Sequence, residues 1–100
     1  MDTLRRKRLV SLNEIGEVFM KVMVRYFASI REATGVKEEE IELPDGGTIE
    51  TLIREAKALH SMLKVQDRVV IVSVNGEFVE ASRRLNATDE VAMFPPVSGG

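Results

Sequence analysis

The residues best suited to chemistry are the last six, Pro95-Pro96-Val97-Ser98-Gly99-Gly100. Proline fixes φ and has no N–H to give to a sheet, so the two prolines stiffen the exit from the preceding fold. Glycine has no Cβ, so the backbone at Gly99 and Gly100 can enter a narrow channel. At ~3.3 Å per extended residue the segment reaches roughly 20 Å. The pattern predicts a stiff stem with an unhindered carboxyl tip, and a frayed terminus is the ordinary alternative.

The other side chains restrict the chemistry that this chain can supply by itself. The sequence holds no cysteine and a single histidine, His60. Disulfides, thiolate metal sites, cysteine nucleophiles and multi-histidine metal sites are therefore excluded. If the chain takes part in sulfur chemistry, the sulfur must be carried on the Gly100 carboxyl group.

Composition indicates one globular domain. The chain has 100 residues, of which 44% are hydrophobic and 30% are charged, enough for a modest core. A net charge of −2 gives no signature of nucleic-acid or anionic-membrane binding. No apolar run approaches the ~20 residues of a membrane span, and the basic residues at 5–8 precede no secretory apolar region. We therefore expect a cytoplasmic protein.

Hydrophobic periodicity predicts the elements that position the tail. Alternation of apolar and polar residues predicts strands, and apolar spacings of three and four predict a helix. The expected strands are residues 21–27, 36–43, 68–74, 77–79 and 90–94. A short helical turn capped by Ser29 is expected at 28–34, and the main helix at 48–59 begins at Thr48. Asn75-Gly76 predicts a type I′ hairpin turn.

One main helix packed on a mixed sheet predicts an α+β fold of the ubiquitin-like β-grasp type, with four or five strands. The expected core is Val22, Val24, Ile41, Leu43, Leu52, Ile53, Val70, Val72 and Val91. Residues 20–94 form the domain in this interpretation, and 95–100 form an extended tail. Residues 1–19 show poor periodicity and are expected to be a flexible extension, with a short added helix as the alternative. Met20 would also be a natural biological start.

Four segments resemble the small subunits of molybdopterin synthase, which are ubiquitin-like β-grasp sulfur carriers. The resemblance covers about residues 20–100, and residues 1–19 match nothing in that family. Its most specific piece is the ending Phe-Pro-Pro-Val-Ser-Gly-Gly at 94–100. The segments are Val24-Arg25-Tyr26-Phe27-Ala28-Ser29-Ile30-Arg31-Glu32, Leu43-Pro44-Asp45-Gly46-Gly47-Thr48-Ile49, Val74-Asn75-Gly76-Glu77 and Asp89 to Gly100.

The resemblance implies a reaction sequence at the tail. A ubiquitin-activating-like adenylyltransferase would use ATP to adenylate the Gly100 carboxylate, and a sulfur donor system would then replace AMP to give a thiocarboxylate. The tail would enter the large subunit of the synthase and donate sulfur to cyclic pyranopterin monophosphate, for molybdenum or tungsten cofactor synthesis. This chain would be a non-catalytic subunit that binds no cofactor itself, within a heterotetramer of two small and two large chains. Gly99 would let the tail pass into both enzymes.

A partner must also hold the body of the domain. Phe27, Phe78 and Phe94 lie near strand ends, where the family has an apolar docking patch. Pro95, Pro96, Val97 and Ser98 are expected to contact the partner as well. For each phenylalanine the alternative is an ordinary place in the core. We expect His60 and the Lys37-Glu38-Glu39-Glu40 run to face water.

Three other functions stay open at this point. The same carrier chemistry could serve thiamin synthesis or tRNA thiolation. The chain could instead be a protein modifier, joined through Gly100 to lysines of its targets. A plain β-grasp binding module with an idle tail is the last alternative.

Overall fold

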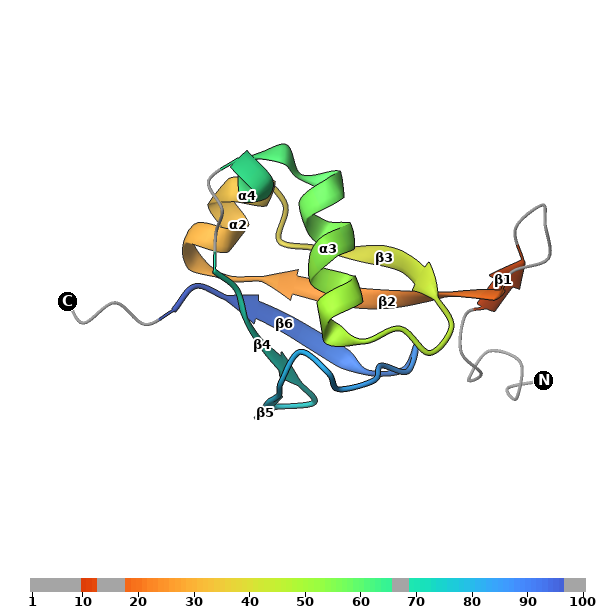
Figure 1. Ribbon diagram of the computed structural model, residues 1–100. Helices are drawn as coiled ribbons and strands as arrows, with labels where there is room; N and C mark the ends of the chain where they lie inside the picture. Colours follow the sequence, from red (N-terminus) through yellow and green to blue (C-terminus); the bar gives the residue numbers. More distant parts are fainter. Residues whose placement is uncertain (1–9, 13–17, 66–68, 97–100) are drawn as a thin grey trace.

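The computed structural model describes residues 10–12, 18–65 and 69–96. The strands form one sheet, and α3 lies across one face of it (Figure 1). The strands are β1 (Val10–Leu12), β2 (Val18–Tyr26), β3 (Glu38–Pro44), β4 (Ile71–Val74), β5 (Glu77–Phe78) and β6 (Glu90–Phe94). The helices are α2 (Ala28–Thr34), α3 (Ile49–Leu59) and α4 (Ser61–Val65).

The sheet is organised around β2. This strand pairs antiparallel with β3 on one side and parallel with β6 on the other. On the far side of β6, β4 and β5 follow in antiparallel order. A mixed sheet under one main helix confirms the α+β, ubiquitin-like β-grasp prediction. The acidic strand β3 lies at an edge of the sheet, since it pairs with β2 alone among the described strands.

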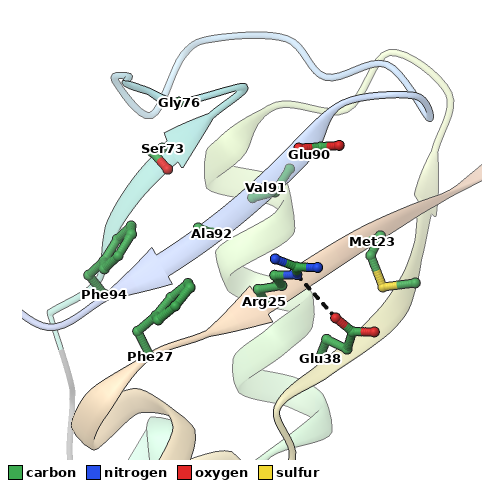
Figure 2. A pocket seen from close by; sticks show the side chains of 10 residues that line it. All are labelled: Met23, Arg25, Phe27, Glu38, Ser73, Gly76, Glu90, Val91, Ala92 and Phe94. Carbon is green, nitrogen blue, oxygen red and sulfur yellow. Dashed lines mark hydrogen bonds and ion pairs between the residues drawn. The ribbon is translucent and has the colours of Figure 1, made fainter.

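Strict alternation along β2 separates the two faces of the sheet. Met20, Val22, Val24 and Tyr26 are at most 1% exposed and belong to the core. The residues between them point to the opposite face, because successive side chains of a strand lie on opposite sides. That second face carries no helix in the described structure, as Figure 2 shows with the helix lying behind the sheet. It is called the open face below.

The main helix begins and packs as its sequence predicts. The Thr51 N–H donates to Oγ1 of Thr48 at 3.4 Å, which satisfies one of the free N–H groups of the first turn. Ile49, Leu52 and Ala56 are buried against the sheet. Leu59 is 57% exposed, so the helical stripe ends one turn earlier than its spacing predicts.

The small helix α2 differs from expectation at its first residue. Phe27, and not Ser29, occupies the N-cap position, and no side chain caps the helix. Gly35 ends α2 with φ 79°, the left-handed conformation expected of a C-terminal glycine.

The predicted core is confirmed for most of its members. Ile53 and Val70 are only partly buried, although both pack against the core. The prediction missed several residues that complete the core beneath the helices, namely Met20, Tyr26, Ile30, Ile49, Ala56, Leu63, Val74, Leu85 and Met93. Leu85 lies in a loop, where periodicity gives no signal.

The region expected to be a flexible extension, residues 1–19, contains ordered strand. Residues 10–12 form β1, which pairs antiparallel with Val18–Met20, and β2 begins at Val18 and not at residue 21. Three residues are too few to show a hydrophobic period, so the sequence pattern does not predict β1. Residues 1–9 and 13–17 lie outside the described structure, so the boundary between extension and domain stays a prediction. No described helix is long and apolar enough to cross a membrane.

Candidate functional site

The open face presents three cross-strand rows, which follow from the strand register. Glu40, Met23 and Glu90 form the first row. The second runs Glu38, Arg25, Ala92, Ser73, Phe78. The third joins Ile71 to Phe94, with Phe27 beside Phe94. The face therefore changes from acidic to aromatic along the direction of β2 and β6, towards the point where the tail leaves (Figure 2).

The aromatic patch is defined by Phe27, Phe78 and Phe94, three residues from three separate segments. The rings of Phe27 and Phe94 stack with centroids 4.8 Å apart and planes at 9°. The ring of Phe78 meets Phe94 edge-on, at 6.1 Å and 67°. Such pairs stabilise by about 0.5–1.5 kcal/mol beyond the area they bury. Phe94 therefore holds the patch together.

None of the three phenylalanines belongs to the core. Phe27 is 39% exposed, Phe78 is 74% exposed, and Phe94 is partly buried. The core alternative raised from the sequence is therefore wrong for all three. Exposed apolar side chains gathered on one face of a small domain mark interaction sites.

Local backbone geometry fixes Phe27 on this face. Its N–H donates to the Met93 carbonyl oxygen at 3.1 Å, which ties the end of β2 to the end of β6. The next residue, Ala28, has φ 54°, a conformation that costs a non-glycine residue about 1 kcal/mol or more. The sharp turn leaves Phe27 on the open face while Ile30 of α2 enters the core.

A buried carboxylate holds Phe78 and Phe94 in register. Asp89 is 7% exposed and accepts hydrogen bonds from Asn75 Nδ2 at 3.0 Å, the Asn86 N–H at 2.8 Å and Arg83 Nη1 at 3.1 Å. Burial alone raises the pKa of Asp89, but these hydrogen bonds and the Arg83 charge outweigh it, so the pKa lies below its ordinary value. The network fixes the β4–β5 hairpin against the start of β6.

The hairpin turn itself has the geometry that its sequence predicts. Asn75 has φ 53° and Gly76 has φ 88°, as a type I′ turn requires. The Asn75 side chain also accepts from the Glu90 N–H at 2.9 Å. The Asn75 side chain therefore bonds both to the Asp89 carboxylate and to the first residue of β6.

Between the rows lies a groove of about 450 Å³. Ala92 and Ser73 form part of its lining, Phe27 and Phe94 close one end, and Glu90 lies at the other (Figure 2). Because Ala92 and Ser73 are small, the middle of the sheet is left lower than its aromatic end. The groove can receive a side chain from a partner.

Sequence reasoning missed two residues of this face. Ile71 is 37% exposed beside Phe94, yet it stands in the continuous apolar run 69–72, in which no alternation marks its outward direction. Arg25 donates from Nε to Glu38 Oε1 at 3.1 Å across β2 and β3. The alternation of β2 did place Arg25 opposite the core, but only the register of β3 reveals its partner.

The tail residues divide into described and undescribed parts. β6 ends at Phe94, so Pro95 and Pro96 follow directly from the aromatic patch, the first partly buried and the second exposed. Val97, Ser98, Gly99 and Gly100 lie outside the described residues. Their expected roles stay predictions, and the structure fixes only where the tail starts.

A second polar cluster lies on the covered side of the sheet. Tyr26 OH donates to Glu39 Oε2 at 2.6 Å, and His60 Nε2 contacts the same oxygen. The side chains of His60 and Glu39 are 15% and 24% exposed, so the expectation that both face water is wrong. Burial, then the hydrogen bond and charge of Glu39, raise the pKa of Tyr26 far above its ordinary value.

The described residues contain no group of three or more His, Asp or Glu side chains placed to hold a metal ion. The open face offers a partner three features, namely the aromatic patch, the groove and an acidic end.

Comparison with known proteins places this fold in a family. The family model described as the ThiS family matches residues 24–100. The molybdopterin synthase sulfur carrier subunit of Chlamydomonas reinhardtii is 39% identical over 83 residues, which cover 81% of this chain and 100% of that protein.

Solved structures share the fold, and two of them illustrate the match. The putative molybdopterin converting factor subunit 1 of Pyrococcus furiosus superposes with a TM-score of 0.71 at 41% identity, covering 77% of this chain and 98% of that one. SAMP1 of Haloferax volcanii also gives 0.71, at 25% identity over 80% and 99% of the two chains. Because the family model spans most of the sequence and the relatives match over nearly their whole length, the chain belongs to the ThiS family.

Proposed function

We propose that this chain is the sulfur carrier subunit of a molybdopterin synthase. The observation that carries the proposal is the position of the aromatic patch. Phe27 and Phe78 stand exposed on the open face beside the partly buried Phe94, and the strand that holds Phe94 leads directly into the Pro95-Pro96 stem. A partner that docks on this patch is placed at the root of the tail.

The relatives support this choice of acceptor. Proteins 31–39% identical over most of the chain carry the name molybdopterin synthase sulfur carrier subunit, and the family model extends through Gly100. In this proposal an adenylyltransferase uses ATP to activate the Gly100 carboxylate, a poor electrophile, by giving it a good leaving group. A sulfur donor then displaces AMP, and the thiocarboxylate formed is the nucleophile that attacks cyclic pyranopterin monophosphate.

The proposal divides the chemistry between this chain and its partner. This chain supplies the carrier carboxyl, the stem and the docking face, while the large subunit supplies the acid–base and oxyanion groups. Prolines at 95 and 96 reduce the conformational entropy lost when the tail is threaded. Glycines at 99 and 100 let both enzymes close around the reacting carbonyl.

One further function has an observation in its favour. SAMP1 of Haloferax volcanii, one of the structures that share the fold, takes its name from a small archaeal modifier protein. Conjugation through Gly100 to lysines of target proteins is therefore the second candidate. Both functions begin with the same adenylate and differ in the group that attacks it.

A variant with one alanine added after Gly100 tests the tail. We expect no thiocarboxylate in the presence of the adenylyltransferase, ATP and a sulfur donor, because the activated carbonyl would no longer sit where the enzyme places it. The matched control adds one alanine before Met1. Full thiocarboxylation of the C-terminally extended variant would refute the tail model. If the unaltered chain instead forms isopeptide bonds to target proteins and no thiocarboxylate, the modifier function is favoured.

A further inference from the structure

The acidic end of the open face has charges that the fold does not use. Two cations, Lys21 and Arg25, lie on this face of β2, and four carboxylates lie on the same face of the neighbouring strands, namely Glu38, Glu40, Glu42 and Glu90. Arg25 is bonded to Glu38, and Lys21 stands opposite Glu42 in the register. The surplus negative charge is therefore concentrated at Glu40 and Glu90.

These two glutamates flank one exposed apolar residue. Met23 is paired with Glu40 across the antiparallel β2–β3 ladder and with Glu90 across the parallel β2–β6 ladder. Met23 is 39% exposed. Directly paired residues of a sheet have their Cβ atoms about 4.5–5.5 Å apart on the same face. Neither glutamate side chain forms an ion pair with a described residue.

The groove connects this row to the aromatic patch. Met23 and Glu90 line one part of it, and Phe27 and Phe94 line the other. A partner that covers the patch beside the tail therefore extends over Met23 as well. Covering two carboxylates without a counter-charge would be unfavourable, because each would lose water and gain nothing in exchange.

We propose that the docking partner places a lysine or arginine side chain over Met23, between Glu40 and Glu90, while an apolar side chain fills the groove beside the aromatic patch. The long aliphatic stem of either residue suits the Met23 surface, and its cationic head suits the two carboxylates. This inference rests on the proposed function and adds the chemistry of the partner's surface to it. The aromatic end provides the anchor, and the acidic end sets orientation and speeds association.

The test measures binding of the purified large subunit of molybdopterin synthase from the same organism. The double variant Glu40→Gln/Glu90→Gln removes both charges and keeps the side-chain shapes. We expect its Kd to rise roughly fivefold or more, with most of the change in the association rate. Its affinity should also depend less on salt between low and physiological ionic strength, because the screened pairs are gone.

The matched control is Glu50→Gln/Glu80→Gln. It removes the same net charge from two exposed residues, Glu50 in α3 and Glu80 in the loop after β5. The Glu50 N–H donates to the Ala81 carbonyl oxygen at 3.0 Å, so this loop lies against α3. We expect its Kd to stay within about twofold of the unaltered chain. The charge-reversed variant Glu40→Lys/Glu90→Lys should bind more weakly than the glutamine variant.

Two results would overturn the inference in different ways. If the unaltered chain binds but Glu40→Gln/Glu90→Gln matches the control in Kd and salt dependence, the basic contact is wrong and the proposed function stands. If the unaltered chain does not bind the large subunit, the proposed function fails and this inference fails with it. Thermal unfolding of each variant verifies that a loss of binding is not a loss of fold.

Discussion

The adjacent glutamates Glu39 and Glu40 should differ sharply in their effect on stability. They are the same residue type on the same strand, but Glu39 faces the covered side of the sheet and Glu40 faces the open side. Glu39 accepts the hydrogen bond from Tyr26 OH at 2.6 Å and contacts His60 Nε2, whereas Glu40 is exposed. Replacing either by alanine removes the same charge and the same number of atoms.

The magnitude follows from the groups left behind. Tyr26 is 1% exposed, so its hydroxyl would lose an ionised acceptor in a place where little water can replace it. A hydrogen bond to a charged group contributes about 1.5–3 kcal/mol, and the contact of the half-buried His60 adds less than that. We expect Glu39→Ala to lower the free energy of unfolding by about 2–4 kcal/mol, and Glu40→Ala to change it by less than about 0.5 kcal/mol.

Urea unfolding followed by circular dichroism at pH 7 measures both values. Because domains of this size have total stabilities of about 5–15 kcal/mol, the Glu39→Ala loss should be plain in the transition midpoint. Equal midpoints for the two variants would refute the claim that the contacts of Glu39 with Tyr26 and His60 stabilise the fold. A larger loss of stability in Glu40→Ala would refute it as well.

The Tyr26 hydroxyl adds a dependence on pH to the same experiment. Its raised pKa means that its contribution is fully present below the ordinary tyrosine pKa of about 10 and is lost as pH rises above it. Tyr26→Phe should therefore reduce the extra loss of stability at alkaline pH. An unchanged alkaline profile in Tyr26→Phe would show that this hydroxyl is not the group responsible.

Three further predictions concern the site. Phe94→Ala removes both ring contacts of the patch and should weaken large-subunit binding by more than about 2 kcal/mol in calorimetry; a larger loss in unfolding free energy than in binding would instead make Phe94 a folding residue. Phe78→Ala, at a 74% exposed position, should weaken binding and leave the thermal midpoint nearly unchanged, and a large drop in midpoint would contradict its exposed role. Asp89→Asn should cost about 2–3 kcal/mol at pH 7; because the pKa of Asp89 is lowered, this difference should shrink as pH falls below about 4, and a difference independent of pH would argue against an ionised Asp89.

Hydrophobic periodicity was sufficient to predict the elements that bury one face and expose the other. The local residue pattern alone predicts three elements, namely the alternation in β2, the helical stripe from Ile49 to Ala56 and the Asn75-Gly76 turn. β1 is the counterexample, because its three residues acquire a strand conformation from pairing with Val18–Met20. Its stability comes from the hydrogen bonds of that pairing, which the residue types at 10–12 do not reveal.

The aromatic members of the candidate site were predictable from the sequence, but their arrangement was not. Residue type and nearness to strand ends singled out the three phenylalanines, yet their exposure depends on the face to which each strand end turns. The turn at Ala28, with its positive φ, decides this for Phe27. Glu39 and Glu40 show the same limit, since a run of glutamates looks uniformly polar until the register assigns each to a face.

The most direct test of the central claim is the intact mass of this chain after incubation with its adenylyltransferase, ATP and a sulfur donor. The sulfur-carrier function predicts a mass gain equal to one exchange of oxygen for sulfur, which fragmentation assigns to Gly100. It also predicts that adding the large subunit with cyclic pyranopterin monophosphate reverses the gain. No exchange at Gly100, or an exchange that persists in the presence of that complete system, would contradict it.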